Sequence, residues 1–249
     1  MQAEQQQGIQ QRAAPAAPAA HVPQEPLRRR ISAWLSRSLQ RFRVVLLVIL
    51  IGGAAFFVGY IVYGEITKKL ASDSTIIADA AQAAFTTWST ESDATKKTAE
   101  EKDLRTKLDN LIRRYPRQYG GQRGLFIRAD LNYSTKAWDA ARKDYEALAA
   151  RFPASYLAPV SLFNAGVCAE ETGDLAGASM LYGQVFGTYK DSTVAPRALF
   201  DAGRVAEARS SWNEAQTDYD QLDSQFPQSV WDRLAKNRLI ELTVEGKVK

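Results

Sequence analysis

The chain has 249 residues, of which 45% are hydrophobic and 24% are charged, as in a largely globular protein. Residues 1–63 contain seven arginines and two glutamates, which leaves 25 basic and 26 acidic side chains for the remainder. Because the remainder is nearly neutral, it lacks the electrostatic footprint of a nucleic-acid-binding domain.

The sequence contains one cysteine, Cys168, and one histidine, His21. A single cysteine excludes an internal disulfide and a cysteine-rich metal site. The lone histidine, in a stretch rich in proline and alanine, excludes Ser-His-Asp and Cys-His catalysis and histidine-based zinc sites. We therefore predict no catalytic, metal-binding or cofactor-binding residues. The remaining catalytic alternative is an enzyme, or an enzyme-associated regulator, that uses carboxylates within residues 64–116.

Residues 1–26 consist mainly of glutamine, alanine and proline. Such a segment buries too little apolar surface to offset the entropy lost on ordering. We predict a disordered cytoplasmic tail, with a short docking peptide for a cytoplasmic partner as the alternative.

Residues 44–63 read VVLLVILIGGAAFFVGYIVY and contain no charged side chain. At a rise of about 1.5 Å per residue, twenty such residues span roughly 30 Å, the thickness of a bilayer core. The apolar run is too long for a cleaved signal peptide, and no suitable cleavage site follows it closely. The segment is predicted to be a transmembrane helix that remains as an anchor.

The basic juxtamembrane segment, 27–43, sets the expected orientation. Six arginines precede Val44 closely, whereas only Lys68 and Lys69 follow the apolar run closely. The positive-inside rule then places the N-terminus in the cytoplasm. The predicted location is the inner (cytoplasmic) membrane, single-pass, with residues 64–249 periplasmic or otherwise extracytoplasmic.

Lipid is the expected neighbour of residues 28–63, and the arginines of 28–43 are placed to meet anionic headgroups. Topology alone explains those arginines equally well. Small residues at Gly52, Ala55 and Gly59 form a stripe that would suit helix association in a homo-oligomer.

The second half of the chain repeats itself with a period of 37 residues. Segments 117–153, 154–190 and 191–227 align without gaps, and a fixed period of this size is typical of a helical solenoid. The aligned columns are Leu125/Leu162/Leu199, Phe126/Phe163/Phe200, Ala129/Gly166/Gly203, Trp138/Leu175/Trp212, Ala141/Ala178/Ala215, Tyr145/Tyr182/Tyr219, Leu148/Val185/Leu222 and Phe152/Tyr189/Phe226.

Each segment is predicted to form two helices. In the second segment, Ser155 is the expected N-cap of the first helix. Gly173 and Asp174 are expected to end that helix and open the next. In the other two segments, Lys136 and Ser210 stand at the glycine position. Small residues in two columns would let paired helices approach closely, and the aromatic columns would fill the space between them.

This order of small residue, Gly-Asp turn, alanine, aromatic residue and closing proline resembles the tetratricopeptide repeat, in the longer variant found in bacterial envelope proteins. The resemblance covers residues 117–227 and implies an all-α solenoid of helical hairpins. The residues that carry it are Gly166, Gly173, Asp174, Ala178, Tyr182, Pro153 and Pro227.

Helices are also expected on both sides of the three repeats. Residues 64–116 are predicted to be membrane-proximal helices that form a degenerate first repeat. Residues 228–249 are predicted to be a capping helix that closes the stack. One face of that helix is expected to carry Trp231, Leu234, Ala235, Leu239 and Leu242.

The resemblance implies that the first helix of each repeat lines an inner face that binds protein partners. The phenylalanines of this face have an alternative role in packing between repeats, and its charges have an alternative role as a solvated surface. The candidate residues are Arg123, Phe126, Asp130, Tyr133, Val160, Phe163, Val167, Glu170, Arg197, Phe200, Arg204 and Glu207.

Taken together, the expected function is a membrane-anchored periplasmic scaffold that binds other envelope or secreted proteins. A single anchor followed by periplasmic repeats is an architecture similar to that of the ancillary subunit of the bacterial Sec translocon. That similarity implies a translocon-associated chaperone or adaptor, or an assembly factor. The alternatives are a structural part of a larger envelope machine, such as a flagellar motor collar, and a self-associating envelope organiser.

Overall fold

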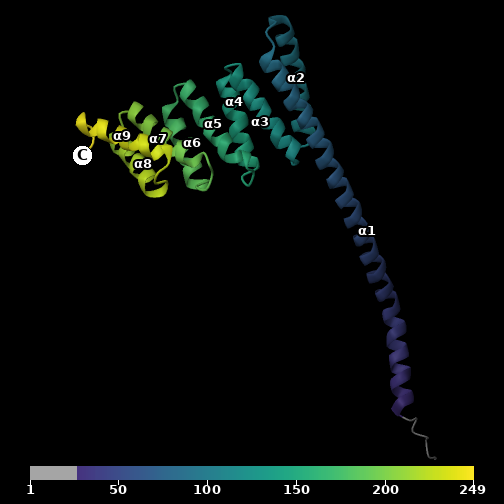
Figure 1. The fold of residues 1–249 in the computed structure, drawn as a ribbon. Helices are drawn as coiled ribbons and strands as arrows, with labels where there is room; N and C mark the ends of the chain where they lie inside the picture. Colours follow the sequence, from purple (N-terminus) through teal and green to yellow (C-terminus); the bar gives the residue numbers. More distant parts are fainter. Residues whose placement is uncertain (1–26) are drawn as a thin grey trace, which may run out of the picture. The chain divides into compact units, whose positions relative to one another are not determined.

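The structure is a computed structural model that describes residues 27–249 (Figure 1). The predicted disordered tail, residues 1–26, lies outside the described residues. Within 27–249 the regular structure is entirely helical, as predicted. The chain separates into a part that ends at Val62 and a part from Tyr63 to Lys249, and each is described by itself.

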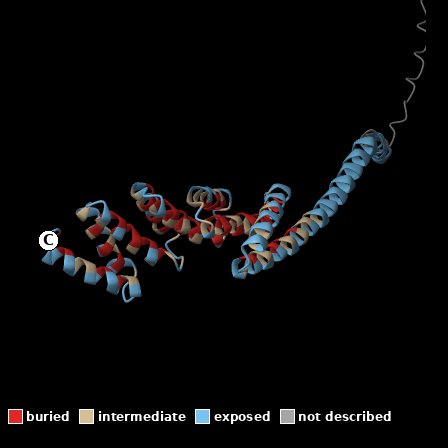
Figure 2. Cartoon of the chain, turned by 90° about the horizontal axis from the view of Figure 1, so that it is seen from above, coloured by how far each residue is buried: buried red, intermediate tan, exposed pale blue. Residues whose placement is uncertain are grey.

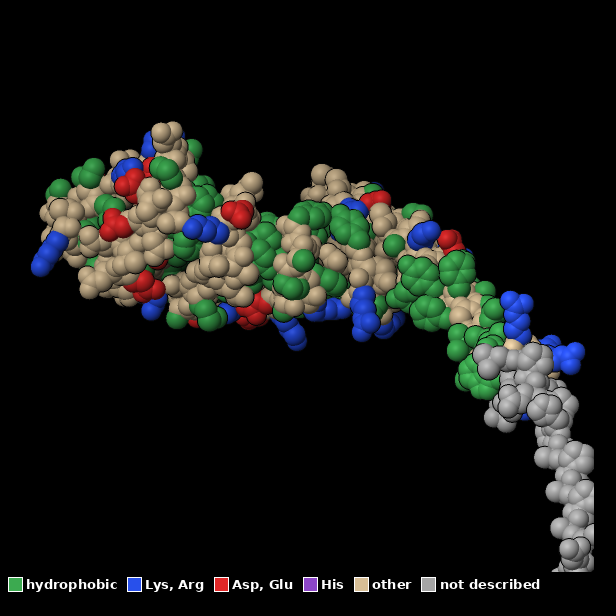
Figure 3. All heavy atoms as spheres, turned by 90° about the horizontal axis from the view of Figure 1, so that it is seen from below, with side chains coloured by type: hydrophobic (Ala, Val, Ile, Leu, Met, Phe, Trp, Pro, Cys, Tyr) green, Lys and Arg blue, Asp and Glu red, His purple; other side chains and the backbone are tan. Residues whose placement is uncertain are grey.

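Helix α1 runs from Leu27 to Thr90 and contains no proline, a residue that kinks or breaks a helix when it stands in the interior. The predicted basic segment 27–43 and the predicted anchor 44–63 both lie within it. The side chains of 44–63 are exposed (Figure 2), and hydrophobic side chains gather on this surface (Figure 3). Among the described helices, α1 is the one long and apolar enough to cross a membrane.

The part from Tyr63 to Lys249 begins with the end of α1 and continues as helices packed side by side (Figure 1). Three helix pairs follow α2: the first pair is α3 and α4, the second pair α5 and α6, and the third pair α7 and α8. The helices are α2 (Ala94–Arg114), α3 (Tyr119–Ser134), α4 (Trp138–Arg151), α5 (Leu157–Glu171), α6 (Leu175–Thr188), α7 (Ala195–Ala208), α8 (Trp212–Gln225) and α9 (Val230–Val244).

The turn inside each pair has the same backbone conformation, whichever residue occupies it. Gly173 has a φ of 77°, in the left-handed region that glycine adopts without steric cost. Lys136 and Ser210 hold φ values of 60° and 59° at the corresponding positions. Asp174 then caps α6 by accepting the Gly177 backbone N–H at 2.9 Å. The predicted break at Gly173 and Asp174 is thus confirmed.

The predicted N-cap of α5 is wrong. The helix begins at Leu157 with Tyr156 as its N-cap residue, and Tyr156 makes no side-chain capping bond. Ser155 lies one residue too early, in a turn after Phe152, where its hydroxyl accepts the Leu157 N–H at 3.2 Å. Lys190 lies in the connection between α6 and α7.

A tyrosine from the second helix packs against a small residue of the first helix in each pair. Tyr145, Tyr182 and Tyr219 are almost completely buried. A Cβ atom built on Gly166 would lie 2.6 Å from the Tyr182 ring, and one on Gly203 would lie 2.5 Å from the Tyr219 ring. These glycines therefore permit a helix approach that a larger side chain would prevent.

The flanking helices extend this packing at both ends. Trp88 of α1 shares a core with Leu104 of α2 and Leu131 of α3. At the other end, Ala235 and Leu242 of α9 are buried against the third pair.

Leu234 does not belong to the buried face of α9, contrary to the prediction, and it is 40% exposed. Adjacent residues on a helix point about 100° apart. Since Ala235 faces the third pair, Leu234 turns toward solvent.

We predict that Gly166→Ala lowers the free energy of unfolding by about 1–2 kcal/mol, because its methyl group must displace the Tyr182 ring. Gly183→Ala in α6 is the matched control, since apart from the adjoining residues and backbone of its own helix no heavy atom lies within 4 Å of the added methyl group. There we expect a gain of about 0.5–1 kcal/mol from the lower entropy of the unfolded chain. Urea unfolding of the full chain in detergent, followed by circular dichroism, measures both. Changes of the same sign in both variants would contradict this account.

Candidate functional site

The twelve predicted inner-face residues lie on the first helices of the three pairs, four on each of α3, α5 and α7. They do not form one continuous site. The structure divides them into packing residues, residues held in ion pairs and residues that line a pocket.

The three phenylalanines pack against the buried tyrosines of their own pairs. The ring centroids of Phe163 and Tyr182 are 5.3 Å apart, a distance typical of aromatic contacts. Phe126 and Phe200 make equivalent contacts at 5.8 Å and 5.7 Å. These positions fit the packing alternative. Val160 also packs partly into the core between the first and second pairs.

Arg123 is engaged by the helix that precedes the pairs. Its guanidinium forms an ion pair with Asp79 of α1 and lies 5.9 Å from the ring of Tyr119. The first position of the predicted inner face is therefore already occupied by an intramolecular contact.

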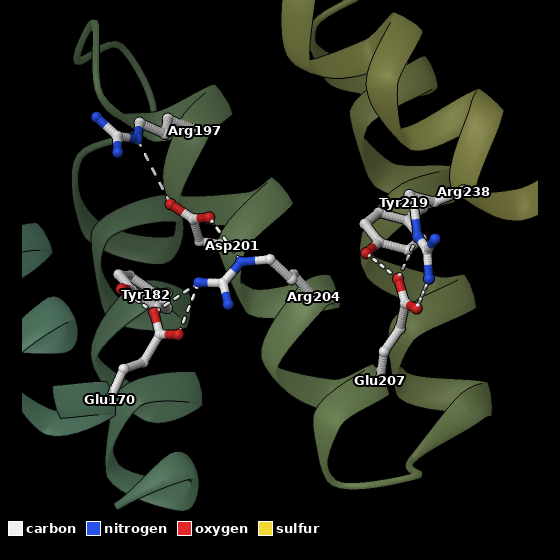
Figure 4. A network of polar contacts seen from close by, with 8 residues as sticks. All are labelled: Glu170, Tyr182, Arg197, Asp201, Arg204, Glu207, Tyr219 and Arg238. Carbon is white, nitrogen blue, oxygen red and sulfur yellow. Dashed lines mark hydrogen bonds and ion pairs between the residues drawn. The ribbon is translucent and has the colours of Figure 1, made fainter. Parts of the chain in front are cut away.

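An ion-pair network joins the second pair to the third (Figure 4). Arg204 of α7 donates to both carboxylate oxygens of Glu170 at 2.7 Å and to Asp201 at 3.2 Å. The hydroxyl of Tyr182 also donates a hydrogen bond to Glu170, with 2.6 Å between the hydroxyl oxygen and Oε1. Arg197 completes the network, because its Nε lies 3.5 Å from Oδ2 of Asp201.

A second network joins the third pair to α9 (Figure 4). Glu207 accepts hydrogen bonds from Arg238 and from the hydroxyl of Tyr219. Burial raises the pKa of Glu207, but the hydrogen bonds from Arg238 and Tyr219 outweigh it and lower the pKa overall. The side chains of Glu170 and Glu207 are only 19% and 10% exposed. The predicted alternative of a solvated charged surface is therefore wrong for these two carboxylates.

A pocket of about 320 Å³ opens between the first and second pairs. Two polar residues in it were not among the candidates, Tyr145 and Asn164. Tyr145 belonged to an aligned column, whereas Asn164 occupies a column with Ile127 and Asp201 and carries no repeated signal. The candidates that the pocket brings together are Asp130, Tyr133, Phe163, Val167 and Arg197.

Asp130 and Arg197 have different electrostatic surroundings. Burial raises the pKa of Asp130 to about 6, although the hydrogen bond from Tyr145 partly opposes this. The Arg197 guanidinium lies 4.7 Å from the Phe163 ring centroid and 5.6 Å from that of Trp231, distances at which cations are attracted to aromatic faces. The pocket therefore combines an unusually basic carboxylate, aromatic walls and one positive charge at its edge.

Comparison with known families gives a match in the first helix pair. The tetratricopeptide repeat family matches residues 123–155, which cover most of α3, all of α4 and the turn between them. No curated protein matches the chain. The match and the succession of helix pairs support a TPR-like protein, and proteins with such repeats commonly bind other proteins.

We predict that Asp130 makes stability depend on pH. A carboxyl group whose pKa is raised in the folded chain stabilises the fold fully at a pH below its pKa in the unfolded chain. This stabilisation is lost as the pH rises through its pKa in the folded chain. The Asp130→Asn variant should therefore gain stability relative to the natural chain between about pH 4 and about pH 6. We expect about 1–2 kcal/mol, because one pKa unit corresponds to about 1.4 kcal/mol and the side chain is partly exposed.

Urea unfolding at both ends of this pH range provides the measurement. Asp139→Asn, on the exposed surface of α4, is the matched control and should follow the natural chain. A stability difference for Asp130→Asn that stays constant with pH would show that the carboxyl group is not perturbed.

Proposed function

We propose that this protein is a membrane-anchored scaffold whose helix pairs bind other proteins. Residues 44–63 would hold it in the inner membrane with the N-terminus in the cytoplasm, and the part from Tyr63 onward would lie on the extracytoplasmic side. The observation that carries the proposal is the combination of a fully exposed apolar helix with TPR-like pairs in one chain.

The membrane assignment has a simple physical basis. Water disfavours an exposed apolar surface, by about 25 cal/mol for each Å². Leu50 and Phe56 are 70% and 78% exposed, and their neighbours throughout 44–63 are similarly uncovered. Such a helix is stable where lipid covers it, and the arginines before Val44 favour a cytoplasmic N-terminus.

The binding assignment rests on the TPR-like pairs and on the pocket between the first two of them. TPR-like proteins are typically non-catalytic scaffolds for protein interactions. The three pairs would act as 37-residue repeats whose first helices face the partner. Envelope or secreted proteins are the proposed partners. We favour a translocon-associated adaptor or assembly factor over a part of an envelope machine such as a motor collar, or a self-associating organiser.

The proposed topology predicts the accessibility of introduced cysteines. Cys168 gives a silent background because it is buried, and burial raises its pKa to about 12. Ser32→Cys and Ser224→Cys place an exposed thiol before and after the anchor. In intact spheroplasts, a membrane-impermeant maleimide should label Ser224→Cys, and should label Ser32→Cys only after lysis. The reverse labelling pattern would show the opposite orientation. Recovery of the chain in the soluble fraction would contradict the proposal that residues 44–63 are a membrane anchor.

The proposed binding face predicts the site of photo-crosslinking in native membranes. A benzoylphenylalanine at Tyr133, in the pocket, should form adducts with partner proteins. The same residue at Met180, which is 64% exposed on α6, is the control and should form few.

Mass spectrometry of the adducts separates the candidate roles. Translocon subunits support the adaptor, motor components support the collar and the chain itself supports self-association. An absence of adducts from Tyr133 would contradict the scaffold proposal.

A further inference from the structure

Asp130 differs from the other carboxylates of the first helices that are at least partly buried, because no arginine in the described part of the chain pairs with it. Glu170, Asp201 and Glu207 each contact an arginine. Asp130 forms no ion pair within the described residues, and its hydrogen bond comes from the uncharged Tyr145 hydroxyl. Among the carboxylates of these helices that are at least partly buried, Asp130 is therefore the one without a cation within the described residues.

The repeat pattern explains why the cation is missing. In the second and third pairs, a glutamate (Glu170 or Glu207) accepts the hydroxyl of the buried tyrosine. The first pair has Tyr133 in that column, so the Tyr145 hydroxyl turns to Asp130, one turn earlier on α3. Glu170 receives its cation from the next pair, where Arg204 stands on α7. For Asp130 the corresponding residue of the next pair is Val167 on α5, so an apolar side chain stands where a basic one would be needed.

We infer that the pocket beside Asp130 receives a basic side chain, lysine or arginine, from the protein partner, an inference that rests on the proposed scaffold function. The walls of the pocket include Tyr133, Tyr145 and Phe163, whose ring faces attract cations. An incoming ammonium or guanidinium would supply to Asp130 the charge that Arg204 supplies to Glu170.

The charges around the pocket favour a cation over an anion. Arg197 at the edge is already paired with Asp201 and lies over Phe163. The exposed Glu171 adds negative charge in the surroundings of Tyr133: burial is the main cause of the raised pKa of Tyr133, and the charge of Glu171 is the next. Desolvation of Asp130 strengthens its attraction for a cation, since the interaction between charges grows as water is excluded.

The test uses the full chain in zwitterionic detergent, with methyl-labelled valines and Val167 as the reporter in the pocket. The probes are three blocked pentapeptides, Ala-Leu-X-Leu-Ala, in which X is lysine, glutamine or glutamate. At about pH 7.5, above the raised pKa of Asp130, the lysine probe should shift the Val167 signals with a Kd at least tenfold lower than the glutamine probe.

Two variants make the outcome specific. Asp130→Asn keeps the shape of the side chain and should abolish the preference for lysine over glutamine. Asp139→Asn removes an exposed carboxylate outside the pocket and should preserve that preference. Equal binding of the lysine and glutamine probes, tighter binding of the glutamate probe, or no shift of Val167 with any probe would overturn the inference.

The crosslinking experiment at Tyr133 distinguishes failure of this inference from failure of the scaffold proposal. Partner adducts at Tyr133 without a lysine preference would overturn the basic-side-chain inference alone. An absence of adducts would overturn the scaffold proposal itself.

Discussion

The contact on which the three helix pairs depend is the one between a buried tyrosine ring and a small residue of the partner helix. Gly166 and Gly203 leave no room for a methyl group, so they determine how closely the two helices of a pair approach. Each ring is buried while its hydroxyl reaches a carboxylate on the first helix. An unpaired buried hydroxyl costs about 1–3 kcal/mol, so this bond is required once the ring is in place.

The carboxylates that receive these hydroxyls also connect one pair to the next. Glu170 binds Arg204 of the third pair, and Glu207 binds Arg238 of α9. Removal of the arginine would leave a largely buried carboxylate without compensation, which costs more than the intact pair contributes. Packing within a pair and ion pairing between pairs therefore meet at the same residue. In the first pair this connection is absent, and the corresponding region is a pocket instead.

The amino-acid sequence predicted the packing residues better than the polar contacts. Aligned columns identify residues such as Gly166 and Tyr182 because a buried contact restricts size at every repeat. Ion pairs are less predictable: Glu170 and Arg204 are 34 residues apart, and only the crossing of two helices brings them together. Leu234 was misplaced because a shift of one residue changes the face of a helix by about 100°. Asn164 repeats nowhere, so no pattern could reveal its place in the pocket.

The left-handed turns have a consequence for how such chains vary. Lys136 and Ser210 occupy a conformation that costs a non-glycine residue roughly 1 kcal/mol, yet the helices on either side begin and end as they do around Gly173. The turn is imposed by the packed helices on whichever residue stands there. Mutation can therefore erase the glycine without altering the architecture, provided that the interior remains intact. Similarity between distant members of such a group would survive longest in side chains that solvent never reaches.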